Sequence, residues 1–344
     1  LFEIMRKSAL ITGISGQDGA YLAKLLIDKN YRVIGTDRRS ARFSNWRLKR
    51  LGIETKIIFE EMELSELYEI QRVFKKYRID EVYHLAAQSF VKTSFSSPLY
   101  TTNITGLGTL RILETIRAVN SKIKFYQASS SEMFGDVLEN VQSEKTQLNP
   151  QSPYAIAKVF AHYMTKNYRK SYGMFAVSGI LFNHESPLRG EEFVTRKIII
   201  GLIKIINGDL NCLELGNIYA KRDWGFAKEY VEAMWLMLQQ KKPEDFVIST
   251  GKTYSIKDFI NKATKILNLK TKWTGKGLKE KLINTVNGKT IVKINSKFFR
   301  PAEVNILKGN ASKAKKKLKW VSKTNIDELI NIMIDEELKH YNKY

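Results

Sequence analysis

Apolar and polar positions alternate along the first half of the chain in a way that predicts strands and helices in turn. Short apolar runs are typical of buried strands, whereas apolar residues that recur every three or four positions are typical of helices covering one face. The runs predict strands over 8–12, 32–36, 81–85, 124–128 and 176–181. The periodic segments predict helices over 21–29, 67–76 and 109–119 and another from 153 onward.

Strands that alternate with helices at this spacing indicate parallel βαβ units. We therefore expect an α/β protein with a doubly wound parallel sheet over 5–182. After about residue 180 the alternation ends, and the pattern predicts helices near 195–207 and 227–240, longer polar loops and a Lys/Gly-rich stretch at 270–297. We expect 183–344 to form a smaller, mostly C-terminal α/β domain, with a segment near 221–250 returning to the first domain.

Composition places the chain among ordinary soluble proteins. It has 344 residues, of which 43% are hydrophobic, and no apolar run approaches the roughly 18 residues of a membrane span. Cys212 is the single cysteine, so no internal disulfide can form. Because Leu1–Lys7 lacks the apolar core of a signal peptide, we expect a cytoplasmic protein.

The net charge of +22 raises the question of a nucleic-acid partner. The lysines are scattered, and the densest run, KAKKKLK at 313–319, is expected to be the solvated face of a helix. Because no recognised nucleic-acid motif accompanies the charge, we do not expect nucleic-acid binding. Attraction of a polyanionic small ligand is the better explanation of the charge.

A glycine-rich segment lies between the first predicted strand and the first predicted helix. Its glycines are Gly13, Gly16 and Gly19, with Gln17 and Asp18 between the last two. Glycines allow a tight turn and a close backbone approach, and the positive end of a helix attracts a pyrophosphate. Because a strand precedes the motif and a helix follows it, the segment predicts a Rossmann-like dinucleotide site.

The end of the second predicted strand bears on the choice between NADP and NAD. Arg38 and Arg39 can pair with a 2′-phosphate, whereas Asp37 stands where a carboxylate would bind the ribose 2′-hydroxyl of NAD. The two arginines favour NADP, but Asp37 leaves NAD open.

Tyr154 and Lys158 lie four residues apart, behind Ser152 and Pro153, which suit the start of a helix. Both side chains should therefore emerge on one helix face. A phenol has a pKa of about 10, but a nearby ammonium favours the phenolate and makes it a usable base. Downstream of a dinucleotide loop, this pair predicts oxidoreductase chemistry.

A second group of polar residues follows the strand at 124–128. Ser130, Ser131 and Glu132 should lie at the carboxyl end of a parallel strand, where doubly wound folds place their chemistry. A simple hydride-transfer enzyme needs no carboxylate beside the tyrosine and lysine. Glu132 therefore points to a dehydration, in which a carbon-bound proton is removed and water is lost.

Together these motifs resemble the extended short-chain dehydrogenase/reductase family and, within it, the GDP-mannose 4,6-dehydratases. The resemblance runs from Ser8 to about Trp320 and includes ALITGISGQDGAYL at 9–22, FYQASSSEMFG at 125–135 and GILFNHESPLR at 179–189.

The resemblance implies a redox-neutral lyase with tightly bound NADP. Tyr154, assisted by Lys158, would deprotonate the sugar's C4 hydroxyl while hydride passes to the nicotinamide. Glu132 would then remove the C5 proton, water would leave from C6, and hydride would return to C6. Ser130 would bond the C4 oxygen, with Ser131 as a candidate assistant.

The resemblance also assigns binding residues. Positions that would line the cofactor are Glu63, Leu64, Leu85, Ala86, Ala87, Ser89, Tyr100, His184 and Arg189. Positions around the GDP-sugar are Ser89, Ser131, Asn183, Val194, Lys197, Arg222, Arg300 and Glu303. No metal is expected. The resemblance further implies a homo-oligomer, either dimer or tetramer, with Arg42 and Arg47 as candidate contacts to a neighbouring subunit.

Several alternatives remain. Ser130 replaces the family's usual threonine. Extra room there and in the sequence around Phe90 to Ser94 leaves open GDP-D-glycero-D-manno-heptose as substrate in place of GDP-mannose. Glu132 argues against a nucleotide-sugar epimerase. A catalytically silent NADP-binding sensor or RNA-associated protein is disfavoured by the intact set of Ser130, Glu132, Tyr154 and Lys158.

Overall fold

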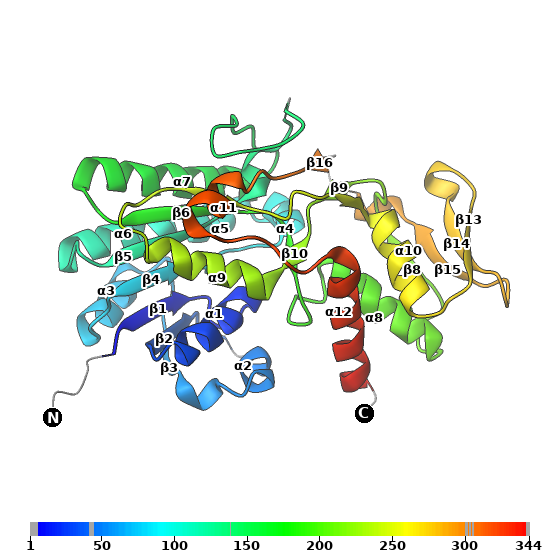
Figure 1. Cartoon of the computed structure of the whole chain (residues 1–344), viewed down its shortest axis with the longest axis horizontal. Helices are drawn as coiled ribbons and strands as arrows, with labels where there is room; N and C mark the ends of the chain where they lie inside the picture. The colour runs from blue at the N-terminus through cyan, green and yellow to red at the C-terminus, as the bar shows by residue number, and fades with distance from the viewer. Residues whose placement is uncertain are drawn as a thin grey trace.

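The computed structural model describes residues 6–40, 45–137, 139–299, 302, 304 and 306–341. In this part of the chain, a large parallel sheet with helices on both faces lies beside a smaller group of helices and strands (Figure 1).

The large sheet confirms the predicted doubly wound fold. The described residues contribute seven strands in the order β11-β6-β5-β4-β1-β2-β3, and every neighbouring pair is parallel. The strands are β1 (Ser8–Thr12), β2 (Arg32–Asp37), β3 (Ile58–Glu61), β4 (Glu81–His84), β5 (Lys124–Ser130), β6 (Ala176–Leu181) and β11 (Phe246–Ile248). The edge strands β3 and β11 were not predicted, since each is too short to give a clear apolar run.

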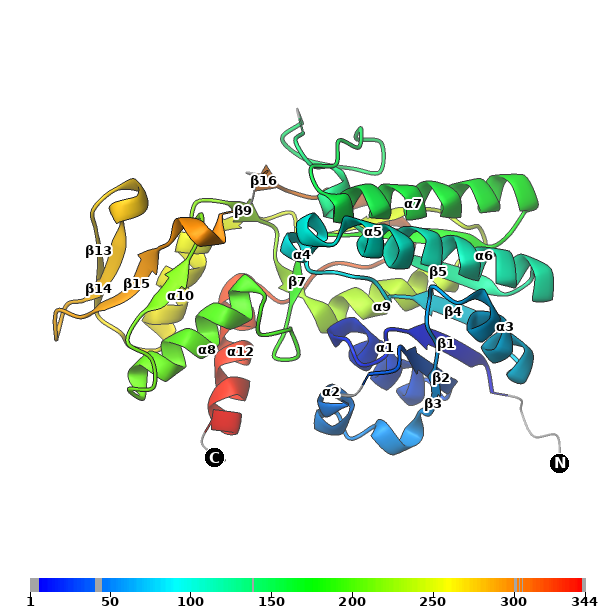
Figure 2. The same cartoon turned by 180° about the vertical axis from the view of Figure 1, so that it is seen from behind.

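Alternate residues of each strand face two different helical layers. Leu10, Val82 and Phe125 pack with α3 (Leu67–Lys76), α6 (Gly108–Val119) and α7 (Pro153–Tyr172). These helices cover the outside of the sheet in the view from behind, with α4 (Val91–Ser96), α5 (Pro98–Thr101) and the π-helix η2 (Thr102–Leu107) next to them (Figure 2).

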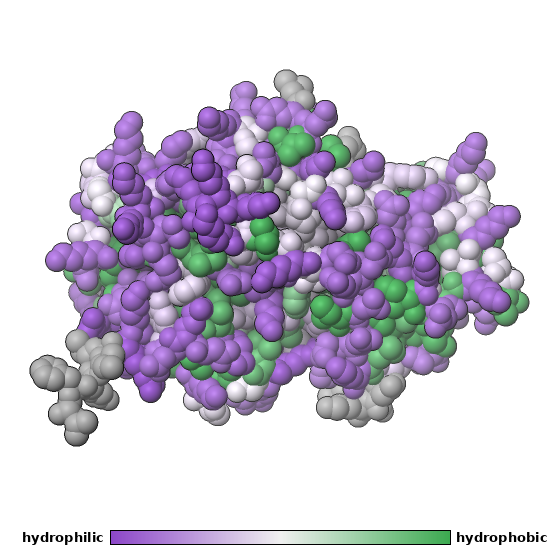
Figure 3. Space-filling view, viewed as in Figure 1, coloured by the Kyte–Doolittle hydropathy of each residue, from purple (hydrophilic) through white to green (hydrophobic). Residues whose placement is uncertain are grey.

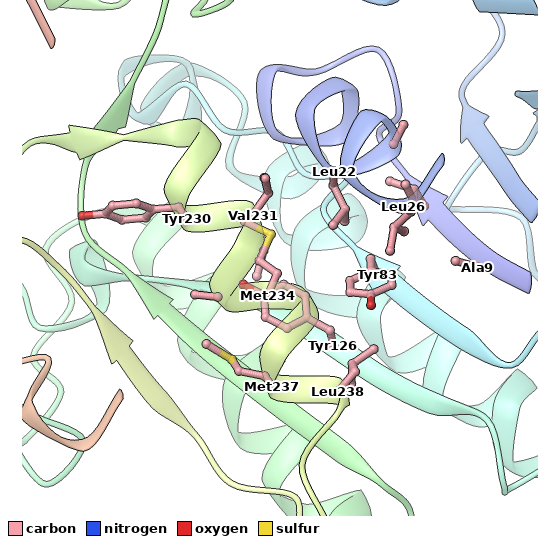
Figure 4. Packing of buried hydrophobic residues seen from close by; sticks show 14 of the residues in the cluster. Ala9, Leu22, Leu26, Tyr83, Tyr126, Tyr230, Val231, Met234, Met237 and Leu238 are labelled. Atoms are coloured by element: carbon pink, nitrogen blue, oxygen red, sulfur yellow. The ribbon is translucent and has the colours of Figure 1, made fainter. Parts of the chain in front are cut away.

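The opposite face of the sheet packs with α1 (Gln17–Asp28) and α9 (Ala227–Leu238). Figure 4 shows Leu22 and Leu26 of α1 and Met234 of α9 converging on Tyr83 and Tyr126 of the sheet. Helix α11 (Ser312–Leu318) joins this layer through buried Ala314 and Leu318, while Lys315, Lys316 and Lys317 are exposed. The densest lysine run is therefore the outer face of a packed helix.

The smaller part has its own apolar core. Helices α8 (Val194–Ile206), α10 (Ile256–Ile266) and α12 (Ile326–Tyr341) pack with a sheet of β13 (Thr271–Thr274), β14 (Lys281–Asn284), β15 (Thr290–Ile294) and β8 (Leu213–Leu215). The Lys/Gly-rich stretch thus contains three strands. The inner face of these strands is buried in the core of the smaller part through Leu282, Ile291 and Val292. The lysines of the stretch are exposed.

Short elements connect the two parts. β7 (His184–Glu185) pairs with β10 (Gly225–Phe226), and β9 (Lys221–Arg222) pairs with β12 (Tyr254–Ser255) and β16 (Ile306–Leu307). The remaining short helices are α2 (Trp46–Arg50) and the 3₁₀ turns η1 (Glu54–Lys56), η3 (Ser131–Met133), η4 (Gly277–Lys279) and η5 (Ser296–Phe298).

Hydrophilic side chains cover most of the face seen in Figure 3, with apolar patches between them. Among the helices that the structure describes, none combines the length and apolar character needed to cross a bilayer.

Candidate active site

Two adjoining hollows lie at the carboxyl ends of the parallel strands. The first, which we call the loop groove, is bounded by Gly13, Gly16 and Asp37 among others. The second, the central cleft, contains Glu132 and Tyr154 and extends to the smaller part of the molecule. Both are lined by Leu85, Ala87 and Ser89, so they form one continuous site.

The structure brings together most residues that the sequence singled out. Those in the loop groove are Gly13, Gly16, Asp37, Arg38, Glu63, Leu64, Leu85, Ala86, Ala87, Ser89 and Tyr100. Those in the central cleft, besides the shared residues, are Asp18, Ser130, Ser131, Glu132, Tyr154, Lys158, Asn183, His184, Arg189, Val194, Lys197 and Arg222.

Three of the predicted residues are described by the structure but are not among those that line the two hollows. Gln17 and Gly19 are buried beneath the loop, and Arg39 is exposed beside it. Arg300 and Glu303 lie outside the described residues, as does Arg42.

The glycine loop leaves no room for larger side chains. Gly13 has a φ of +72°, and a Cβ there would lie 2.9 Å from the Ala86 Cα. A Cβ on Gly19 would lie 2.4 Å from the Gly13 carbonyl oxygen. Helix α1 begins at Gln17, four residues before the predicted start at 21, because Gly19 lets its first turn approach the loop. Gly16 precedes the helix without a capping side chain. The backbone N–H groups at this end of the helix can therefore donate hydrogen bonds to an anion.

Asp37 supports the loop from the end of β2. Its Oδ2 accepts a hydrogen bond of 2.9 Å from the Ser15 N–H. Burial raises the pKa of this carboxyl group, opposed by the bonds to Ser15. Arg38 NH1 donates to the Tyr100 hydroxyl at 3.0 Å on the other side of the groove.

Helix α7 places Tyr154 and Lys158 in the central cleft. Ser152 Oγ accepts from the Ala155 N–H at 3.1 Å, and Pro153 occupies the first turn, as the sequence predicted. Lys158 Nζ donates to the Ala128 carbonyl at 2.7 Å and lies 5.8 Å from the centre of the Tyr154 ring.

Burial disfavours the charged forms of both groups. It raises the pKa of Tyr154 to about 12, with a hydrogen bond to Ser130 acting in the opposite direction. It lowers the pKa of Lys158 to about 8. The phenol therefore needs further positive charge close by to ionise at neutral pH.

Strand β5 delivers the other polar residues to the same cleft. It continues to Ser130, two residues beyond the predicted end at 128, and then turns into η3. Ser130 Oγ accepts from the Glu132 N–H at 3.2 Å and fixes this turn. Glu132 thereby lines the cleft beside Tyr154.

The wall opposite β5 carries His184, which is held between two acceptors. Its Nε2 lies 2.7 Å from Asp18 Oδ2, and its Nδ1 lies 2.7 Å from the Phe182 carbonyl oxygen. Because an ionised carboxylate and a carbonyl oxygen can only accept hydrogen bonds, this geometry favours the imidazolium form of His184. Burial alone would lower the pKa of His184, but the Asp18 carboxylate raises it above its ordinary value.

Sequence reasoning considered the segment around Phe90 but missed the contacts that the aromatic residues of the cleft make. Phe90 and Phe193 meet edge to face at 5.7 Å, although they come from distant segments. Phe298 lies under Lys197, whose Nζ is 4.0 Å from the ring centre. Nothing in the sequence signals these contacts, because they depend on how the two parts of the molecule meet.

Comparisons with known proteins show which family the chain resembles over nearly its whole length. Residues 10–333 match the family model described as GDP-mannose 4,6 dehydratase. The chain is 47% identical to GDP-mannose 4,6 dehydratase of Dictyostelium discoideum, over 97% of each chain. It is 46% identical to GDP-mannose 4,6-dehydratase of Vibrio cholerae, over 97% of this chain and 95% of the other.

Solved structures share the fold at lower identity. dTDP-glucose 4,6-dehydratase of Bacillus anthracis in complex with NAD has a TM-score of 0.81 at 17% identity, covering 98% of each chain. RMD of Pseudomonas aeruginosa complexed with NADPH has a TM-score of 0.76 at 19% identity, covering 97% of this chain and 99% of the other.

The charged pair of His184 and Asp18 predicts a pH-dependent stability. A raised native pKa stabilises the fold fully below the unfolded pKa of about 6.5, and the contribution is lost as pH rises through the native value. The contribution of His184 is the free energy of unfolding of the unmodified protein minus that of His184→Gln. This difference should therefore fall as pH rises above neutrality. Urea unfolding at a series of pH values measures this difference. Asp18→Asn should flatten the same curve, and a difference independent of pH would show that His184 is neutral.

Proposed function

This chain belongs to the GDP-mannose 4,6-dehydratase family, and we propose that it converts GDP-mannose to GDP-4-keto-6-deoxymannose with no net redox change. It is accordingly a hydro-lyase. The observation that carries the proposal is the meeting of Ser130, Glu132, Tyr154 and Lys158 in one cleft beside a dinucleotide loop.

We propose NADP as the bound cofactor. The nicotinamide would supply a hydride acceptor at the start of the reaction and a hydride donor at its end. Related folds were solved with NAD and with NADPH. Asp37 already accepts the Ser15 N–H, which engages the carboxylate that would otherwise favour NAD. Arg38 lines the groove and Arg39 is exposed beside it, so both can approach a 2′-phosphate.

Tyr154 and Lys158 would carry out the first proton transfer. Tyr154, as phenolate, takes the proton of the C4 hydroxyl, and Ser130 donates to the same oxygen. The Lys158 ammonium, held by the Ala128 carbonyl, stabilises the phenolate. Since burial raises the pKa of Tyr154 to about 12, the positive charge of Lys158 and of the oxidised nicotinamide is needed to form this base.

Glu132 would carry out the elimination. A 4-keto group acidifies the C5–H bond, so a carboxylate can remove that proton. The proton then leaves with the C6 hydroxyl as water, and a double bond forms between C5 and C6. When hydride returns to C6, C5 takes up a proton, and the sum is loss of one water. An epimerase needs no such base, and Glu132 therefore separates the two reactions.

The smaller part of the molecule would bind the GDP portion. We propose that 183–344 provides this site, with Asn183, Val194, Lys197 and Arg222 lining the cleft. Lys197 Nζ lies 2.9 Å from the Glu214 carbonyl oxygen, and Arg222 NH1 lies 2.7 Å from that of Val304. These contacts hold both cations at the cleft, where they can meet a diphosphate.

We propose that the protein forms at least a dimer through the outer face of α7. Ile156, Phe160 and Tyr163 are 56%, 38% and 52% exposed at helical spacing. Leu99 and Leu107 add apolar surface from α5 and η2, which pack against α7 (Figure 2). An apolar surface of this extent on a soluble protein is typical of an interface. Because α7 also carries Tyr154 and Lys158, a second copy would support the helix that holds them.

Glu132→Gln tests the proposed reaction. The variant should form no 4-keto-6-deoxy product from GDP-mannose, or form it with a turnover lower by about 100-fold or more, because it lacks the base. Partial reduction of bound cofactor should persist. The product is followed by mass and by NMR, with GDP-D-glycero-D-manno-heptose run in parallel to test the alternative substrate.

Asp136→Asn is the matched control, since Asp136 is exposed four residues further along the chain. It should keep full activity. Turnover of neither GDP-sugar by the unmodified protein would refute the dehydratase, and full activity of Glu132→Gln would remove Glu132 from the mechanism.

Denaturing the protein should release NADP, which mass spectrometry of the freed dinucleotide identifies. The double variant Arg38→Met/Arg39→Met should lose its preference for NADP over NAD by about 10-fold or more, as charged hydrogen bonds to the 2′-phosphate are removed. Calorimetric titration with both dinucleotides measures the preference. Release of NAD from the unmodified protein would instead show that Asp37 sets the choice.

Ile156→Glu/Phe160→Glu should dissociate the dimer, because it places two charges in the apolar face. Sedimentation equilibrium measures the mass in solution. Tyr68→Glu alters an aromatic side chain on α3 that is 77% exposed, more than either Ile156 or Phe160, and should leave the assembly unchanged. A monomeric unmodified protein would contradict the proposed interface.

A further inference from the structure

Helix α2 connects the two walls of the site through one side chain. Arg47 Nε donates to the Leu188 carbonyl at 2.6 Å, and its NH1 donates to the Ser15 carbonyl at 3.0 Å. Ser15 belongs to the glycine loop, and Leu188 belongs to the segment that runs toward α8. These two donors of Arg47 are therefore engaged within its own chain, and its expected contact with a neighbouring subunit stays a prediction.

A second arginine holds the next peptide of the same segment. Arg196, 5% exposed, donates from NH1 to the Arg189 carbonyl at 2.6 Å and from NH2 to Glu337 Oε2 at 3.2 Å. The Trp46 ring contacts both arginines, since its centre is 4.5 Å from the Arg47 guanidinium and 5.1 Å from that of Arg196. Two successive carbonyls, those of Leu188 and Arg189, thus accept hydrogen bonds from two guanidinium groups that contact one indole ring.

The residue fixed in this way presents a third guanidinium to the central cleft. Arg189 lies 3.6 Å from the centre of the Phe193 ring, and its Nε is 3.3 Å from Glu185 Oε2. It lines the same cleft as Asp18, His184 and Tyr154. Phe193 and Glu185 determine where the Arg189 side chain points, whereas Arg47 and Arg196 determine where its backbone lies.

The arrangement carries an electrostatic cost. Burial, and next the nearby Arg196, lower the pKa of Arg47 to about 10. Glu192 and Asp18 act in the opposite direction. A group of like charges beside a cleft is stabilised when an anion binds there, and Arg189 is the member of this group that lines the cleft.

We propose that Arg47 is a positioning residue that couples the glycine loop to Arg189, so that both contact the diphosphate of one bound dinucleotide. The inference rests on the proposed function only in assuming that a dinucleotide binds in this site. Arg47 itself need not touch the ligand: a single rigid fork bonded to both walls keeps their spacing fixed. Without it, the loop and Arg189 would each be free to move, and binding would have to order them.

Arg50 offers a matched control on the same helix. Its NH2 donates at 3.1 Å to both the carbonyl oxygen and the Oε2 of Glu336 in α12, so it also ties α2 to a distant element. It contacts neither the glycine loop nor Leu188 in the described structure. If Arg47 only supported the fold, the two arginines would be equivalent.

The test is a double-mutant cycle on the full-length protein. Arg47→Met should weaken NADP⁺ binding by about 10-fold or more, and Arg189→Met should do so at least as strongly. The double variant should lose less affinity than the two single losses combined, because part of the effect of Arg47 passes through Arg189. Arg50→Met should stay within about twofold of the unmodified protein. Calorimetry gives the dissociation constants, and thermal unfolding shows whether the variants remain folded.

Wild-type affinity in Arg47→Met, or effects of Arg47→Met and Arg189→Met that simply add, would overturn the coupling. If Arg47→Met does not fold, Arg47→Lys replaces it: one ammonium cannot reproduce the fork, so affinity should fall to an intermediate value, and unchanged affinity would refute the proposal. A protein that binds NADP⁺ as predicted but dehydrates no sugar would refute only the proposed function.

Discussion

The buried ion pair between Asp18 and His184 is the contact on which the site depends. It joins the first turn of α1, which follows the glycine loop, to the strand that opens the opposite wall. Gln17 adds two hydrogen bonds between the same segments: it donates to the His184 carbonyl at 3.1 Å and accepts from Ser186 Oγ at 2.7 Å. In the proposed site the Asp18 carboxylate alone would repel a pyrophosphate, and an imidazolium at His184 would neutralise it. The same pair would then fix the geometry of the site and balance its charge.

The parallel sheet then determines where the chemistry lies. Strands β5 and β6 are neighbours and end at the same edge, so Ser130 and Asn183 reach the cleft from adjacent positions. Helix α7 begins above that edge, which brings its first turns, with Tyr154 and Lys158, over the end of β5. Glu132 lies in the short turn η3 after β5, two residues beyond Ser130. Ser130, Glu132, Tyr154 and Lys158 thus meet from three elements, β5, η3 and α7.

The sequence predicted the parts of the structure that rest on local patterns. The predicted strands at 8–12 and 176–181 and the helix at 67–76 match the structure, because each combines a buried run or stripe with clear ends. The predicted start of the first helix, at 21, was four residues too late, since the helix begins at Gln17. Gly16 and Gly19 interrupt the apolar periodicity at this point. The catalytic group could be expected from spacing and resemblance. The imidazolium state of His184 and the bonds of Arg47 and Arg196 could not, because they join residues more than a hundred positions apart or depend on backbone carbonyls, which carry no sequence signal.

The central claim is that this cleft moves a hydride within one sugar while Glu132 expels water. GDP-mannose carrying deuterium at C4 tests it most directly. The account predicts that the product is a 4-keto-6-deoxy sugar with the deuterium in its C6 methyl group and a solvent-derived hydrogen at C5. Deuterium lost to solvent, or returned to C4 with the C6 hydroxyl still in place, would contradict it.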